Sequence, residues 1–148
     1  MGSVTGNNTE AGNYAYGYDN IYQLTATTGP STSEAFSYGP AGNRLTSSLR
    51  VSGANAAISS YTHNANNALV QSSRGSAEAT SYQYDSNGNL VKKTETDDWK
   101  TRTWTYSYDF ENRLVKAVKQ KAKTASTVTV SFKYDPFGRR IEKKVEKT

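Results

Sequence analysis

Residues that could carry catalysis are few in this chain of 148 residues. His63 is the single histidine, and nucleophilic catalysis needs a base beside its nucleophile. It follows Tyr61 by two residues, at a position where the local pattern places an aromatic ring. We therefore interpret His63 as a packed substitute for tyrosine, in preference to a catalytic base or metal ligand. The sequence contains no cysteine, which excludes disulfides and thiolate metal sites.

Four aspartates that directly follow a tyrosine raise the question of paired-carboxylate chemistry, which hydrolases use. They are Asp19, Asp85, Asp109 and Asp135. Each stands where a turn is expected, and an Asx-type hydrogen bond to the backbone explains it there without catalysis. Asp97 and Asp98 would point to opposite faces of a strand, and no calcium-binding loop pattern occurs. We expect no enzyme activity, no catalytic residues, no cofactor and no metal ion.

An internal repeat supplies the elements that must position these residues. Six segments share an aromatic-x-aromatic pair, a turn, and Leu or Ile six or seven residues after the second aromatic position. That second position falls at residues 18, 38, 63, 84, 108 and 134, so the period is 20 to 26 residues. The residues that define the repeat, and for which we expect a structural role, are Tyr16, Tyr18, Asp19, Leu24, Phe36, Tyr38, Gly42, Leu45, Tyr61, His63, Leu69, Tyr82, Tyr84, Asp85, Gly88, Leu90, Tyr106, Tyr108, Asp109, Leu114, Phe132, Tyr134, Asp135, Gly138 and Ile141.

Each repeat has the pattern of a β-hairpin. Side chains alternate along a strand, so both aromatic residues of a pair lie on one face. Asp or Asn then opens a turn, Gly or Asn can supply a positive φ, and Leu or Ile begins the return strand. We predict about twelve strands and little or no helix, with 116–123 as strand and loop. Outer loops between hairpins are expected at 25–34, 53–60, 72–80 and 119–127.

The fold class predicted is all-β, a repeat array of about six antiparallel β-hairpins. We expect residues 1–13 to form a flexible N-terminal segment and residues 14–148 to form one structural unit. Only 34% of residues are hydrophobic, whereas eleven are Tyr, so polar-tipped aromatic rings must supply much of the buried area. No apolar run is long enough to span a membrane, and because residues 1–8 have neither a charged start nor an apolar stretch, we expect no signal peptide within this sequence.

Charge is divided unevenly along the chain, whose formal net charge is +5. Residues 1–90 carry three basic and five acidic side chains, and residues 91–148 carry fifteen basic and eight acidic ones. Lys and Glu are mixed along the expected strands, which favours a solvated face over an anion-binding surface. A nucleic-acid partner is not favoured, because no recognition motif accompanies the basic residues.

The repeated unit Tyr-x-Tyr-Asp-x-x-Gly-Asn/Arg-Leu closely resembles the YD repeats of the RHS family, which also occur in teneurins and in the shell-forming component of ABC toxin complexes. The clearest copies begin at Tyr84 and Tyr134, whereas Gly39 and the His63-Asn64 pair depart from the pattern. The resemblance implies hairpins paired side by side into a curved single-layer strip. In that family the strip forms a hollow shell that encloses a toxic domain or cargo, which implies a secreted or cell-surface protein.

Two functions follow as hypotheses. The first is a non-catalytic structural scaffold: a strip of an RHS-type encapsulating shell, or a self-assembling array that pairs with other YD repeats or with copies of itself through edge strands and a Tyr-rich face. Twelve strands span on the order of 55 Å, too little to close around a folded cargo. The second is an extracellular carbohydrate- or protein-binding module, with glycans stacking on Trp99, Trp104, Tyr106 and Tyr108.

Overall fold

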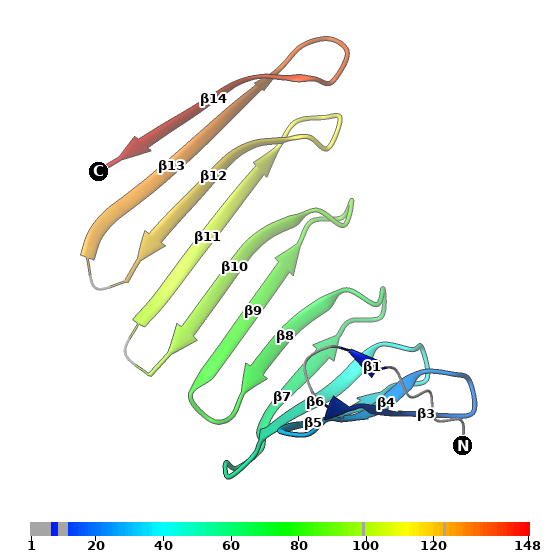
Figure 1. Ribbon diagram of the computed structural model, residues 1–148. Coiled ribbons are helices and arrows are strands. Elements are labelled where there is room, and N and C mark those ends of the chain that lie inside the picture. The colour runs from blue at the N-terminus through cyan, green and yellow to red at the C-terminus, as the bar shows by residue number, and fades with distance from the viewer. Residues whose placement is uncertain (1–6, 9–11, 99, 123) are drawn as a thin grey trace.

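The computed structural model describes residues 7–8, 12–98, 100–122 and 124–148. Twelve strands form one open antiparallel sheet in which each strand pairs with its sequence neighbours (Figure 1). A separate two-stranded ladder precedes it. The strands are β1 (Asn7–Asn8), β2 (Gly12–Asn13), β3 (Ala15–Tyr18), β4 (Leu24–Thr28), β5 (Thr32–Tyr38), β6 (Arg44–Val51), β7 (Ala57–His63), β8 (Leu69–Arg74), β9 (Glu78–Tyr84), β10 (Leu90–Asp97), β11 (Lys100–Tyr108), β12 (Leu114–Lys121), β13 (Thr124–Tyr134) and β14 (Arg140–Lys147).

The architecture confirms the predicted all-β strip of six antiparallel hairpins. The described residues contain no helix, and residues 114–121 form strand β12 as expected. The strip curves, so that β3–β6 are seen nearly edge-on in Figure 1 while β9–β14 face the viewer. In the predicted flexible segment 1–13, β1 pairs with β2, and residues 1–6 and 9–11 lie outside the described residues. No helix among the described residues is long and apolar enough to cross a membrane.

Every hairpin contains one β-bulge at the same place on its return strand. In the β11–β12 hairpin, Tyr108 pairs with Leu114 and Ser107 pairs with Lys116, so Val115 is the extra residue. A bulge of this kind bends its strand and increases the local right-handed twist. The equivalent extra residues in chain order are Thr25, Leu45, Val70, Val91, Val115 and Ile141.

The register corrects the expected start of two return strands. The sequence alignment placed Leu45 and Ile141 at the first return position, but the strands begin one residue earlier, at Arg44 and Arg140, which pair with the second aromatic residue. Arginine fits there because its planar guanidinium stacks on an aromatic face. The Arg44 Cζ lies 4.7 Å from the ring centroid of Phe36, and the Arg140 Cζ lies 5.6 Å from the ring at the matching position of β13.

The outer loops are shorter than the sequence predicts. In place of a loop over 25–34, β4 ends at Thr28 and β5 begins at Thr32. The loops expected at 53–60, 72–80 and 119–127 likewise consist partly of strand. Ser, Thr and Lys suggested loops, yet Thr is β-branched and suits a strand, and polar side chains tolerate the solvated face of a single sheet.

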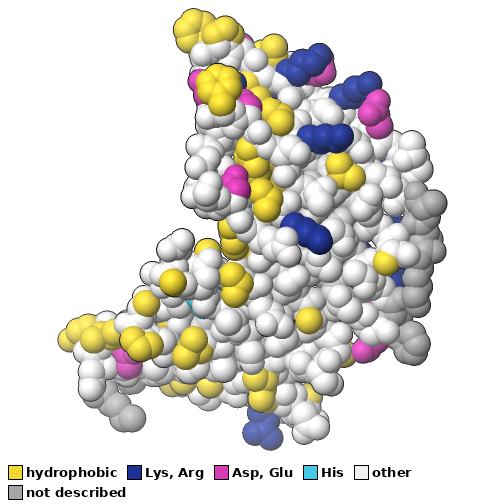
Figure 2. Space-filling model, turned by 180° about the vertical axis from the view of Figure 1, so that it is seen from behind, with side chains coloured by type: hydrophobic (Ala, Val, Ile, Leu, Met, Phe, Trp, Pro, Cys, Tyr) yellow, Lys and Arg dark blue, Asp and Glu magenta, His cyan; other side chains and the backbone are white. Residues whose placement is uncertain are grey.

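A single layer leaves this chain without a closed core. Among the described residues, none of the hydrophobic or polar side chains is fully buried. Burial alternates along the strands: in β9, Tyr82 and Tyr84 are half-buried whereas Gln83 between them is exposed. Hydrophobic side chains gather along the side of the molecule where the hairpin tips lie (Figure 2). In β9 the face that carries the two tyrosines is therefore the more buried face of the strand.

Candidate functional site

The hairpin tips are built by the aspartates that the sequence singled out. The Asp109 Oδ1 accepts hydrogen bonds from the backbone N–H groups of Glu111 at 3.0 Å and Arg113 at 2.9 Å. Asp19, Asn64, Asp85 and Asp135 make the same pair of bonds in their own tips. These are the Asx-type bonds that we expect at turns. In five of the six tips a single Asp or Asn side chain, with its oxygen directed at the backbone, is therefore a structural cap.

A left-handed residue closes every tip, four positions after the second aromatic residue. Its φ lies between 60° and 84° in all six hairpins. Gly42, Gly88 and Gly138 occupy three of these positions, and Asn67 and Asn112 occupy two, as the expected turn chemistry requires. In the first hairpin the position is held by Tyr22, with φ 63°. The sequence pattern did not identify Tyr22, because a tyrosine gives no turn signal.

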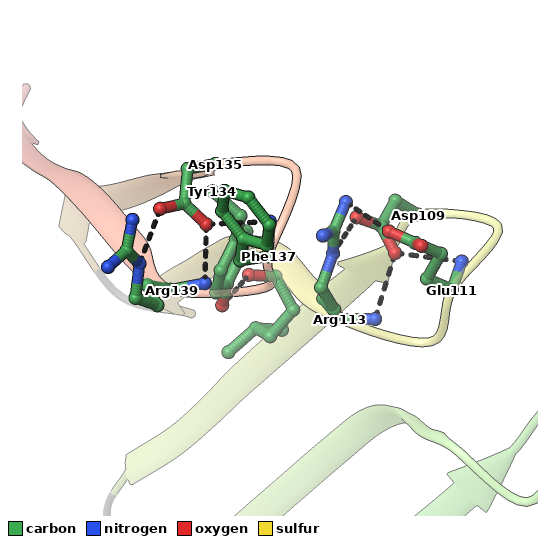
Figure 3. Close-up of polar contacts among 8 residues, drawn as sticks. Asp109, Glu111, Arg113, Tyr134, Asp135, Phe137 and Arg139 are labelled. Carbon is green, nitrogen blue, oxygen red and sulfur yellow. Dashed lines mark hydrogen bonds and ion pairs between the residues drawn. The ribbon is translucent and has the colours of Figure 1, made fainter.

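Arginine stiffens the last two tips, which Figure 3 shows side by side. The Arg113 Nε lies 2.7 Å from the Asp109 Oδ2, and the Arg139 Nε lies 2.6 Å from the Asp135 Oδ2. Partial burial alone would raise the pKa of Asp109, but hydrogen bonds from the Arg113 backbone and side chain outweigh it and hold that pKa below its usual value. The pKa of Asp135 is also lowered, first by the backbone N–H of Arg139 and then by its side chain.

A tyrosine hydroxyl fastens each of four hairpins to the one before it. The second tyrosine of the later hairpin donates a hydrogen bond to the backbone carbonyl that begins the return strand of the earlier hairpin. The four bonds are Tyr38 to Leu24 at 2.8 Å, Tyr84 to Leu69 at 2.9 Å, Tyr108 to Leu90 at 3.0 Å and Tyr134 to Leu114 at 2.8 Å. Desolvation by burial raises the pKa of Tyr84 and of Tyr108, in the direction that favours the protonated, donating hydroxyl.

Asparagine side chains add a second link between tips. The Asn43 Nδ2 donates to the Asn67 Oδ1 at 2.8 Å across the second and third hairpins. The Asn112 Oδ1 accepts from Asn87 at 3.1 Å and from Asn89 at 2.7 Å across the fourth and fifth. These contacts, like the tyrosine hydroxyl bonds, join residues of consecutive hairpins, so they link neighbouring tips along one side of the strip.

The junction between the second and third hairpins lacks the tyrosine hydroxyl bond. His63 stands where the third hairpin would carry its fastening tyrosine, and the buried His63 Nδ1 has no hydrogen-bond partner. Gly39 replaces the capping aspartate of the preceding hairpin. A groove of about 350 Å³ lies here, lined by residues of both tips including Pro40 and Leu45. The two departures from the repeat therefore meet at one seam.

The residues considered for ligand stacking are engaged with their neighbours. The Lys93 Nζ lies 5.3 Å and the Lys119 Nζ 5.0 Å from the Trp104 ring centroid, on the two strands that flank β11. Burial raises the pKa of Tyr106, and Tyr108 donates its hydroxyl to a backbone carbonyl. Trp99 lies outside the described residues. A sugar would have to displace two ammonium groups to reach Trp104.

No group of three or more metal-ligating side chains occurs within the described ranges. The capping aspartates lie on separate tips, so they do not converge on one point. What the structure does bring together is the second tyrosine, the first return residue and the capping turn of each repeat. Sequence reasoning identified these residues but missed the hydroxyl bonds between hairpins, because partners 14 to 20 residues apart leave no local signature.

Comparison with known families gives one decisive match. The sequence model described as the teneurin YD-shell matches residues 2–148. The chain belongs to the teneurin YD-shell family. A comparison with curated proteins gives no match. The predicted RHS/YD resemblance is thereby confirmed.

Solved structures share the YD-shell fold at low sequence identity. The crystal structure of TcdB2-TccC3-Cdc42 matches 95% of this chain with a TM-score of 0.58 and 14% identity. The Photorhabdus luminescens Tc holotoxin pore, with a mutated TccC3, matches 92% of the chain with a TM-score of 0.56 and 14% identity. The YD-shell chain spans 9% of the length of each of these chains.

Proposed function

We propose that this YD-shell chain is a non-catalytic segment of shell wall, whose repeat-defining residues act structurally and whose strip forms part of an encapsulating scaffold. The observation that carries the proposal is the Tyr hydroxyl bond, repeated at 2.8 to 3.0 Å across four junctions. An enclosing wall must resist separation between hairpins, and a bond from each hairpin to the backbone of the previous one opposes this separation directly.

The family and the fold likeness to Tc toxin structures support this role. A wall segment of this kind would be secreted or displayed at a cell surface, and would meet other YD repeats and an enclosed cargo. Glycan binding receives less support, because Trp104 is flanked by two lysine ammonium groups.

Hydrogen exchange of single variants tests the wall role. Tyr84→Phe removes the hydroxyl that bonds to the Leu69 carbonyl and should speed amide exchange in β8 and β9 about fivefold, from the loss of about 1 kcal/mol. Tyr82→Phe is the matched control, since Tyr82 lies two residues away on β9 and makes no hydroxyl hydrogen bond among the described residues. The wild-type sheet should be protected from β4 to β13.

The outcome that would contradict the proposal is specific. If the backbone amides of the central strands exchange at the rate of an unfolded chain, the strip is not rigid enough to serve as a shell wall. Equal effects of Tyr84→Phe and Tyr82→Phe would show that the hydroxyl bond does not hold the hairpins together.

A further inference from the structure

All five junctions between hairpins use one register. Eight residues after the second aromatic position of one hairpin, the chain pairs with the residue three positions before the second aromatic position of the next. The junction between the second and third hairpins follows this pairing like the others, so what distinguishes it is its side chains. The five pairs are Ala26–Ala35, Thr46–Ser60, Gln71–Ser81, Lys92–Thr105 and Lys116–Ser131.

Gly39 removes a hydrogen-bond acceptor from the second tip. In the other five tips, the Oδ1 of an Asp or Asn accepts from the backbone N–H groups two and four positions later. In the second tip these N–H groups belong to Ala41 and Asn43, and neither has an acceptor among the described residues. The turn itself is retained, since the Gly39 N–H donates to the Asn43 carbonyl at 2.8 Å. The second tip therefore offers two backbone donors to an acceptor from another molecule.

His63 removes a phenol from the same junction. At the other four junctions a tyrosine hydroxyl donates to the first carbonyl of the return strand, which here belongs to Arg44. An imidazole is shorter than a phenol and carries no hydroxyl. Its Nδ1 is buried without a partner, although buried polar atoms nearly always have one. The junction thus lacks both groups that Asp and Tyr supply elsewhere in the repeat.

Both departures open into one groove of about 350 Å³. Ala41 and Asn43 line it from the second tip, His63 lines it from the third hairpin, and Pro40 and Leu45 add apolar surface. None of the nine described residues that line it is acidic, so no carboxylate of the lining opposes an incoming anion.

A regular junction shows that one ligand can reach both positions. Desolvation by burial and Tyr106 raise the pKa of Tyr108, and the Asp85 carboxylate raises it further. Asp85 caps the fourth tip, and Tyr108 fastens the fifth hairpin to it. The capping carboxylate of one tip therefore lies within electrostatic range of the fastening phenol of the next.

We propose that this groove binds a partner peptide in which a tyrosine stands beside a carboxylate. The carboxylate accepts hydrogen bonds from the N–H groups of Ala41 and Asn43. The tyrosine ring packs against Leu45 and His63, and its hydroxyl donates to the Arg44 carbonyl. The site goes beyond the proposed wall function, because it uses the two positions at which the chain departs from its repeat.

The internal repeats favour this occupant over other anions. Five tips show that the two donors accept one carboxylate or amide oxygen, and four junctions show that a tyrosine ring fits against the preceding hairpin. Hydrogen bonds from backbone N–H groups to a carboxylate are charge-assisted and roughly twice as strong as neutral ones. The carboxylate should therefore contribute more to affinity than the hydroxyl does.

Three small probes test the site on the full chain. N-acetyl-L-tyrosine carries both groups, N-acetyl-L-tyrosinamide lacks the carboxylate, and N-acetyl-L-phenylalanine lacks the hydroxyl. In a titration followed by amide NMR shifts, N-acetyl-L-tyrosine should shift the Ala41 and Asn43 amides most. Its Kd should be about tenfold lower than that of the amide and about fivefold lower than that of the phenylalanine probe.

Two variants place the ligand in the groove. Gly39→Asp supplies an internal acceptor, and its Cβ has room, because the nearest atom, the Leu45 Cδ2, lies 3.5 Å away. It should abolish the preference for N-acetyl-L-tyrosine over its amide, whereas Ala65→Asp, which adds the same charge to the exposed third tip, should leave that preference intact. His63→Tyr fills the groove from within and should weaken binding of all three probes at least tenfold.

The result that would overturn the proposal is an absence of shifts at Ala41 and Asn43 up to the solubility limit of N-acetyl-L-tyrosine. Equal affinities for N-acetyl-L-tyrosine and its amide would do the same, as would a preference that survives Gly39→Asp. Circular dichroism of each variant should match the wild-type spectrum, which ties any change in binding to the groove and not to unfolding.

Discussion

Replacing His63 with tyrosine should repair the irregular junction between the second and third hairpins. A phenol at this position would direct its hydroxyl toward the Arg44 carbonyl, the counterpart of the carbonyls that accept from four other tyrosines. The groove of about 350 Å³ beside His63 provides the space. His63→Tyr therefore adds the missing link without enlarging a packed core.

The expected gain has two parts. A net hydrogen bond contributes about 1 kcal/mol, and removal of the unpartnered Nδ1 relieves roughly 1 kcal/mol more. For a chain of this size, about 2 kcal/mol corresponds to a rise in Tm of roughly 4–8 °C. Thermal and urea unfolding followed by circular dichroism would measure it, together with hydrogen exchange of β6 and β7.

His63→Phe is the matched variant, because it removes the unpartnered nitrogen and fills the same space without a hydroxyl. It should recover only the second part of the gain, which leaves about 1 kcal/mol between the two variants. If His63→Tyr is no more stable than His63→Phe, the hydroxyl does not reach a backbone carbonyl. If both are less stable than the wild-type chain, His63 has a favourable role that this reasoning lacks.

Three further predictions concern the tips and seams. Tyr22→Asn should raise the free energy of unfolding by about 1 kcal/mol, because φ 63° is strained for tyrosine and tolerated by asparagine; an unchanged urea midpoint would show that the backbone bears no strain there. Tyr108→Phe should lower the same free energy by about 1 kcal/mol in urea unfolding, and Tyr106→Phe should change it less. Folded-state pKa values of Asp85, Asp109 and Asp135 lie below the unfolded value of about 3.9, so their stabilisation is present above that value and is lost as pH falls through the lower folded pKa values. The Tm should therefore begin to drop below about pH 4, and replacing all three aspartates with asparagine should flatten that drop.

The repeat made most of the fold predictable from the sequence. Alternation in Thr127–Tyr134 predicted the strand, and the turn residues predicted the tips. Two errors arose where one residue type replaces another of different chemistry. Arg44 occupies the first return position, where other repeats have leucine, and it stacks on an aromatic ring. Tyr22 adopts the left-handed backbone conformation that glycine usually supplies.

The candidate site was less accessible to sequence reasoning. The capping role of Asp109 depends on its own turn and could be expected locally. The bond from Tyr134 to the Leu114 carbonyl spans two hairpins, and it requires the bulge at Val115 to set the register. The pairing of Trp104 with Lys93 and Lys119 likewise depends on registers that no single strand encodes.

The constant register has a consequence for how such a chain can vary. From the second aromatic residue to the first return residue, every tip spans six residues, for example Tyr18 to Leu24 and Tyr134 to Arg140. The outer segments between paired positions differ in length: Ala35 follows Ala26 by nine positions, whereas Ser131 follows Lys116 by fifteen. Insertions are thus absorbed on one side of the strip only. A peptide tag or a whole domain could be spliced into an outer turn without shifting the faces of the following strands, whereas one residue added to a tip would turn the next strand inside out.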